Sequence, residues 1–147
     1  GPGGGGTGMG RLDRAILEAA ADIRCDVCHA LAREVFMQSS EATRGGVQDV
    51  TEESIFARSH RQCQGQVPPL LHRYSVVPRP GADADAARAK FVLGERDGQT
   101  TLTNFEASSF KKACTAVVQE VDDTLAERTY VAVKERWGGD AKSLGRK

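Results

Sequence analysis

The feature that most constrains the fold is a long stretch without glycine or proline, residues 11–38. Apolar residues recur in it every three or four positions, which is the repeat of an α-helix. They are Ile16, Ala20, Ile23, Val27, Leu31 and Val35. Polar side chains, among them Glu18, Asp22 and Asp26, fall on the opposite face, which we expect to meet solvent. The pattern predicts one long amphipathic helix over residues 11–38.

A second helical pattern covers residues 108–137, where Ser108 or Ser109 can cap the first turn. Its apolar stripe consists of Phe110, Cys114, Val117, Val118, Val121 and Leu125. After Ala126 the apolar positions move around the helix, to Tyr130, Val133 and Trp137. One straight helix cannot bury both sets against the same partner, so we expect a bend or break near Glu127–Thr129.

Two smaller elements are expected between the long helices. A helix near residues 51–64 can be capped by Asp49 together with Glu52, or by Thr51 alone, and would turn Phe56 and Cys63 inward. Farther along, two β-capable runs, 91–93 and 100–103, flank Asp97-Gly98 and predict a small hairpin over residues 90–103. The expected fold class is therefore mainly α, with a small β-hairpin insertion.

The composition limits the organisation and the partners. A chain of 147 residues fits one domain. Twenty basic and twenty acidic residues leave no basic field to attract nucleic acid, which we exclude as a partner. We expect a domain over residues 11–138, flanked by a disordered glycine-rich tail or tag remnant at 1–10 and a frayed tail at 139–147. Gly1-Pro2 is typical of the pair that a tag-removing protease leaves.

The four cysteines, Cys25, Cys28, Cys63 and Cys114, allow three complete pairings. Cys63 and Cys114 fall on the apolar sides of two different predicted helices, so we favour a disulfide between them. It would close a loop of about fifty residues and, in the chain-entropy model, stabilise the fold by about 4 kcal/mol. Cys25 and Cys28 lie at the margin of the first apolar stripe, where both thiols could reach a neighbouring element.

The run Cys25-Asp-Val-Cys28-His29 admits several interpretations. C-x-x-C-H matches c-type haem attachment with His29 as the axial ligand, and C-x-x-C matches a thiol redox motif. Zinc could be held by Cys25 and Cys28 together with His60 and Cys63. The structural alternative is a pair of helix cysteines with disulfide partners elsewhere. We expect this last role, with no bound metal, no cofactor and no catalytic residues; His60 and His72 are expected to be surface histidines without an acidic partner.

In the order of its cysteines and their surroundings, the chain resembles the canopy family of saposin-like proteins of the endoplasmic reticulum. The first match is the C-x-x-C run inside a helix, Cys25-Asp-Val-Cys28-His-Ala-Leu-Ala-Arg-Glu-Val. The second is Cys63 shortly before Leu71-His-Arg-Tyr-Ser-Val76, and the third is Phe110-Lys-Lys-Ala-Cys114-Thr-Ala-Val-Val-Gln-Glu-Val. The order fits from Asp22 to Trp137.

The resemblance implies a saposin-like helical bundle that is not an enzyme. It implies a binding module of the endoplasmic reticulum lumen or the secretory pathway, acting on protein clients as a folding cofactor or receptor-maturation factor. The family has two further cysteines that pair with the first two, and this sequence lacks them. Either the sequence stops short of them, or Cys25 and Cys28 are free or joined to each other. Two alternatives stay open: a lipid-interacting saposin-like protein, and a thiol oxidoreductase that uses Cys25 and Cys28.

Overall fold

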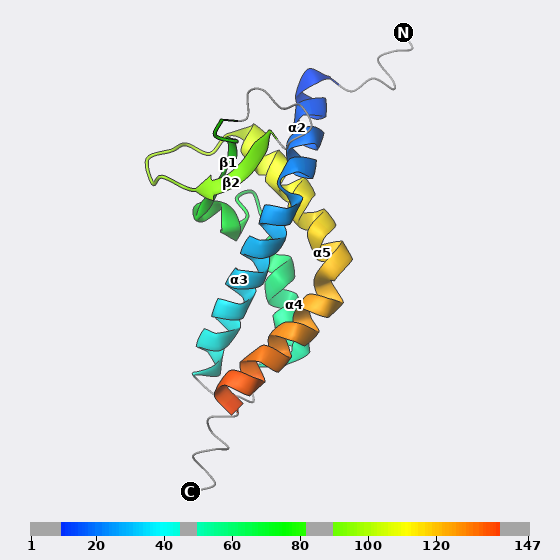
Figure 1. Ribbon diagram of the computed structural model, residues 1–147, viewed down its shortest axis with the longest axis vertical. Helices are drawn as coiled ribbons and strands as arrows, with labels where there is room; N and C mark the ends of the chain where they lie inside the picture. The colour runs from blue at the N-terminus through cyan, green and yellow to red at the C-terminus, as the bar shows by residue number, and fades with distance from the viewer. Residues whose placement is uncertain (1–9, 45–49, 82–89, 139–147) are drawn as a thin grey trace, which may run out of the picture.

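The computed structural model describes residues 10–44, 50–81 and 90–138 (Figure 1). It is mainly α-helical with one two-stranded antiparallel sheet, as the sequence predicts. The predicted tails at 1–10 and 139–147 lie outside the described residues, apart from Gly10. The elements are α2 (Arg11–Asp22), α3 (Arg24–Thr43), α4 (Glu52–Arg61), the 3₁₀ turn η2 (Pro69–His72), β1 (Tyr74–Pro78), β2 (Phe91–Glu95), α5 (Asn104–Val133) and the π-helical turn η3 (Lys134–Gly138).

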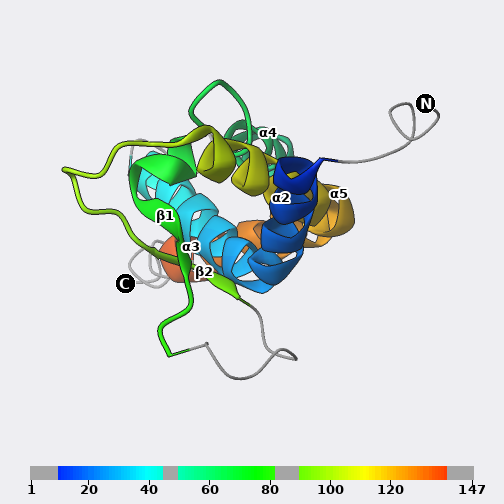
Figure 2. The same ribbon diagram turned by 90° about the horizontal axis from the view of Figure 1, so that it is seen from above.

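The helices form a small bundle around an aliphatic core. Helices α3 and α5 run side by side in the same direction, and α4 runs back along one side of them and contacts both (Figures 1 and 2). The largest fully buried side chains include Phe110, Ile23, Leu31, Ile55 and Leu70. Among the described residues, no helix has both the length and the apolar character needed to cross a bilayer.

The predicted helix over 11–38 is in fact two helices, with a joint at Ile23 (φ −93°, ψ 2°). The joint is a kink rather than a gap, because the Ile23 N–H still donates to the Ala19 carbonyl and the Val27 N–H to the Ile23 carbonyl. The kink lies next to the hairpin. Asp22, just before the kink, and Asp26, in the turn after it, both accept hydrogen bonds from the hairpin backbone. Helix α3 then continues to Thr43, beyond the predicted end.

Helix α5 differs from its prediction at the start and in the middle. It begins at Asn104, and its cap is Thr103, whose side-chain oxygen accepts a hydrogen bond from the Glu106 N–H at 3.1 Å. Ser109, a predicted cap, lies fully buried inside the helix. The helix is unbroken across residues 127–129, so a break there is wrong. The other expected alternative, a bend, agrees with the gradual change of direction of α5 along its length (Figure 1), which lets both the early and the late apolar residues reach the core.

Helix α4 is capped by Thr51, which is one of the two caps that the sequence predicts. The Thr51 hydroxyl accepts from the Ser54 N–H and the Ser54 hydroxyl accepts from the Thr51 N–H, each at 3.0 Å, which is a reciprocal capping box. Asp49, the other candidate cap, lies outside the described residues.

The hairpin uses a different partner strand from the predicted one. Strand β2 pairs with β1, with Val76 opposite Leu93 and Val77 opposite Val92, and residues 100–103 form no strand. The Asp97-Gly98 turn does form: the Asp97 carboxylate accepts from the Gln99 N–H. Valines 76 and 77 offer apolar cross-strand partners that the threonines around residue 100 do not, and burial decides the pairing.

Carboxylates from the helices bind the free edges of this hairpin. At the start of β2, Asp22 accepts from the N–H groups of Phe91 and of Lys90 just before the strand, at 3.3 and 2.9 Å, and Asp26 accepts from the Leu93 N–H at 3.1 Å. The expectation that Asp22 and Asp26 simply face solvent is therefore wrong. Since an isolated two-stranded hairpin is only marginally stable, these bonds anchor it to the bundle.

The edge of β1 is held by a buried ion pair, Arg96–Glu106. The Arg96 Nη2 donates to Glu106 Oε2 at 2.7 Å, and the same oxygen accepts from the Val76 N–H at 3.0 Å. The Arg96 Nε donates to the carbonyls of Leu71 and Tyr74 at 2.6 and 3.1 Å. Both charged side chains are only 9% exposed, so the pair joins η2, β1 and α5 in a region shielded from water.

Candidate functional site

The structure contains the Cys63–Cys114 disulfide that the sequence favours. It joins Cys63, two residues beyond the end of α4, to Cys114 in the first half of α5, with the two Cα atoms 5.4 Å apart. Both cysteines are buried, so the bond lies in the core and carries no chemistry at the surface. Its effect is to fix α4 against α5.

Cys25 and Cys28 are both free thiols in the structure. Cys25 is exposed and Cys28 is half-buried against the core. Because of the kink at Ile23, both lie in the first two turns of α3 rather than deep inside a single helix. The zinc interpretation fails on one ligand, because the Cys63 sulfur is bonded to Cys114. Among the described residues there is no group of three or more histidine, cysteine or acidic side chains placed to hold a metal ion.

The histidines occupy three different settings. His29, the ligand of the haem interpretation, is exposed on α3, and His72 is exposed at the end of η2. His60 was expected to have no acidic partner, but its Nε2 lies 3.7 Å from an Asp122 carboxylate oxygen and its ring stacks on Phe56 at 4.3 Å. The sequence could not reveal this pairing, since the two residues are far apart in the chain and meet only when α4 packs on α5.

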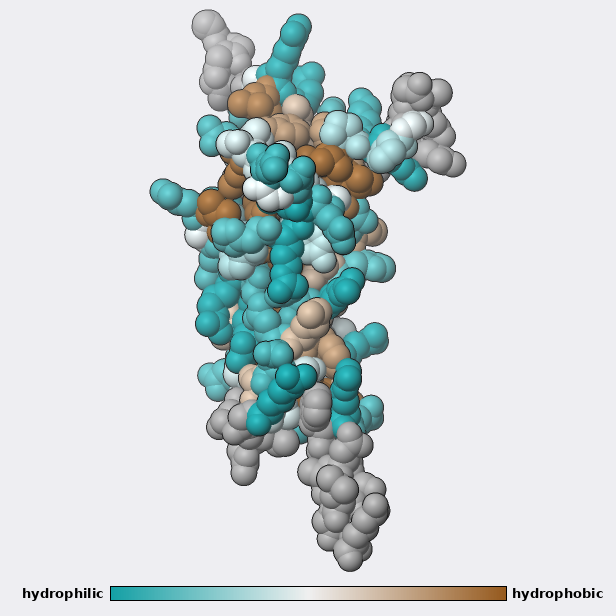
Figure 3. Space-filling model, turned by 90° about the vertical axis from the view of Figure 1, so that its left-hand side faces the viewer, coloured by the Kyte–Doolittle hydropathy of each residue, from teal (hydrophilic) through white to brown (hydrophobic). Residues whose placement is uncertain are grey.

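On the side of the molecule that carries the hairpin, the surface changes from apolar at one end to hydrophilic at the other. Figure 3 shows this side, with apolar side chains gathered at the upper end around the hairpin and a mostly hydrophilic surface below it over α3. In the loop after α4, the apolar side chain of Val67 is 41% exposed.

The site with the clearest binding character is an apolar groove between α3 and α5, which we call the α3–α5 groove. It has a volume of about 330 Å³. Its lining consists of Cys28, Ala32, Phe36, Val121, Thr124, Leu125, Arg128, Thr129 and Ala132. These residues follow helical spacing on each helix, so the groove runs along both axes.

The position of the groove follows from the packing of α5. The helix turns Asp122 toward His60 of α4, and the adjacent face, with Val121 and Leu125, toward α3. At the end nearer α2, an ion pair between Arg24 and Glu120 links the two helices directly beyond the groove. The groove therefore lies between two helices that are held together by the core and by the Arg24–Glu120 pair, while the disulfide fixes α4 against α5.

Sequence reasoning identified Cys28 as a candidate but missed the rest of the groove. The signal was present in part: Val121 and Leu125 belong to the predicted stripe of α5, while Ala32 and Phe36 lie beside the stripe of α3. What the sequence lacked was the relative rotation of the two helices, which decides whether such residues are covered or open.

Comparison of the chain with protein-family models, with curated proteins and with solved structures finds no match. The resemblance to the canopy family thus stays a prediction from the cysteine pattern, and the function has to be argued from the geometry.

Proposed function

We propose that this protein is a non-enzymatic, disulfide-stabilised helical module that binds apolar segments of protein clients. The observation that carries the proposal is the α3–α5 groove, which leaves Phe36, Val121 and Leu125 only partly buried on a rigid framework. Apolar grooves between helices suit the apolar face of an amphipathic helix. The canopy-like order of the cysteines agrees with this function.

The disulfide supports a location in an oxidising compartment, such as the endoplasmic reticulum lumen or the secretory pathway. Disulfides persist in such compartments and are rare where thiols are kept reduced. In this proposal neither thiol is catalytic: Cys28 forms part of the groove wall, and Cys25 is an exposed thiol outside the groove.

The test uses an uncharged amphipathic peptide of leucine and glutamine, about 16 residues or four helical turns long, with a fluorescent label. Fluorescence anisotropy measures its affinity for the wild type and for two variants. Ala132→Glu places a charge in the groove, and Val131→Glu places the same charge on the next residue, which is 47% exposed outside it. We expect the first variant to weaken binding about tenfold or more, because the longer side chain takes up space in the groove and its carboxylate must lose water when the peptide binds, even where it pairs with Arg128 one turn earlier. The second variant should change the affinity little.

The outcome separates the alternatives. Equal effects of the two variants would show that the groove does not bind the peptide. If vesicles of phosphatidylcholine bind the wild type in a way that Ala132→Glu abolishes, and the peptide does not bind, the lipid-interacting alternative replaces the proposal. If the wild type reduces insulin disulfides and Cys25→Ser abolishes that activity, the oxidoreductase alternative does.

A further inference from the structure

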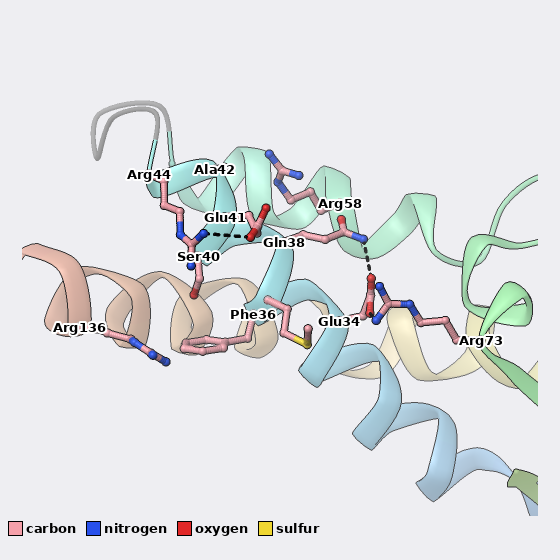
Figure 4. A pocket seen from close by; sticks show the side chains of 11 residues that line it. Glu34, Phe36, Gln38, Ser40, Glu41, Ala42, Arg44, Arg58, Arg73 and Arg136 are labelled. Atoms are coloured by element: carbon pink, nitrogen blue, oxygen red, sulfur yellow. Dashed lines mark hydrogen bonds and ion pairs between the residues drawn. The ribbon is translucent and has the colours of Figure 1, made fainter. Parts of the chain in front are cut away.

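A large hollow lies at the C-terminal half of α3 and is lined by four arginines. We call it the arginine pocket; its volume is about 840 Å³. Arg44 follows α3, Arg58 comes from α4, Arg73 follows η2, and Arg136 comes from η3 (Figure 4). Four separate elements thus bring guanidinium groups to one place, although the chain as a whole has equal numbers of acidic and basic residues.

The arginines of the pocket exceed its carboxylates by two. The carboxylates are Glu34, which accepts from Arg73 at 3.1 Å and from Gln38, and Glu41, which lies 3.6 Å from Arg44 (Figure 4). The second pair is weak, because both of its side chains are about 70% exposed. Arg58 is half-buried, and its guanidinium makes no ion pair or hydrogen bond to another described residue. A cluster of this kind attracts anions, and guanidinium groups match carboxylates and phosphates in shape as well as charge.

The pocket adjoins the α3–α5 groove. Phe36 lines both, and Met37, which is 42% exposed, adds apolar surface to the pocket. On the other side of α4, by contrast, Phe56 lies among four carboxylates, those of Glu52, Glu53, Asp123 and Glu127. An anionic ligand is repelled from that surface and attracted to the arginine pocket.

We propose that the arginine pocket binds the carboxylates of an acidic stretch that follows the apolar segment of a protein client. This inference rests on the proposed function, since the same client would place its apolar face in the groove. The pocket extends along α3 from Glu34 to Arg44, about 15 Å at 1.5 Å per residue. That length matches a row of carboxylates along a peptide better than a single phosphate of a lipid headgroup.

The experiment compares two extensions of the leucine and glutamine peptide, one ending in four glutamates and one in four glutamines. We expect the acidic tail to raise the affinity for the wild type about tenfold at low ionic strength and less at high ionic strength, because salt screens charge pairs. Arg58→Gln should remove most of that gain. Arg61→Gln is the matched control, since Arg61 is also in the last turn of α4, is exposed, and does not line the pocket.

The results distinguish this inference from the proposed function. If both peptides bind equally well and Arg58→Gln has no effect, the groove binds clients and the arginine pocket does not, so the inference fails alone. If neither peptide binds, both fail. If vesicles containing phosphatidylserine bind with the same dependence on Arg58 while the acidic tail adds nothing, the pocket is a lipid headgroup site and the inference is overturned.

Discussion

The buried pair Arg96–Glu106 makes a quantitative prediction for the substitution Glu106→Gln. The change keeps the volume of the side chain and leaves an oxygen that can still accept from Arg96 and from the Val76 N–H. What is lost is the negative charge opposite a guanidinium that is 9% exposed. Hydrogen bonds to a charged partner stabilise a protein by about 1.5–3 kcal/mol, against about 0.5–1.5 kcal/mol for neutral ones. Only the bond from the Val76 N–H changes from a charged to a neutral acceptor, since Arg96 stays charged, and that change costs about 1 kcal/mol. The larger part of the loss is the buried guanidinium charge left without its counter-charge. Since removing one partner of a buried ion pair costs about 3–5 kcal/mol, we expect a total loss of at least about 3 kcal/mol.

This loss is a large part of the stability of a domain of this size, which is about 5–15 kcal/mol. Urea denaturation followed by far-ultraviolet circular dichroism measures it, with an unchanged slope as evidence that the folded state is intact. The control is Glu120→Gln on the same helix, which removes the charge from the exposed pair with Arg24 and should cost at most about 1 kcal/mol. Equal losses for the two variants would refute the argument, because burial would then make no difference.

Three further predictions follow from the covalent and local structure. Replacing Cys63 and Cys114 together by alanine should lower the free energy of unfolding by about 4 kcal/mol, since the disulfide closes a sequence separation of 51; a loss below 1 kcal/mol in urea denaturation would contradict this. N-ethylmaleimide should label Cys25 faster than Cys28 in the native protein, because Cys25 is exposed and Cys28 is half-buried. If peptide mapping showed the reverse order, Cys28 would not form part of the groove wall as described. Thr51→Ala should cost about 1 kcal/mol in thermal unfolding through loss of the capping box, and no measurable change would show that the cap is not used in solution.

The sequence predicted the helices because their signal is local. The apolar periodicity of α3 and α5 marked the residues that are now buried, and the same stripes placed Cys63 and Cys114 where they can meet. The start of α5 was wrong by one turn because Ser108 and Ser109 resemble caps, and only the tertiary structure shows that Thr103 has that role. Propensity ranks candidate caps but does not choose among neighbours.

The hairpin and the candidate sites were harder to predict, because they depend on contacts between distant residues. The partner of β2 is β1, which the segment 79–90 separates from it, whereas the Asp97-Gly98 turn suggested a neighbour in sequence. In the same way, no local pattern announces that Arg58 and Arg73 will line one pocket. Charged residues on helices are usually solvated. Those that line a pocket instead can be recognised only once the relative positions of the helices are known.

The two ends of α3 have separate roles, and this leads to the last prediction. At the junction of α2 and α3, Asp22 and Asp26 hold the hairpin, which Glu106 holds from the other side. From Cys28 onward, α3 lines the groove and then, from Glu34, the arginine pocket. Since Glu106 and Arg58 share no partner, their effects should be independent. Glu106→Gln should lower stability without changing the affinity for the acidic peptide when binding is measured well below the unfolding temperature. Arg58→Gln should lower the affinity for the acidic peptide without changing the stability. A loss of affinity in Glu106→Gln would show instead that the hairpin attachment and the binding surface are coupled through α3.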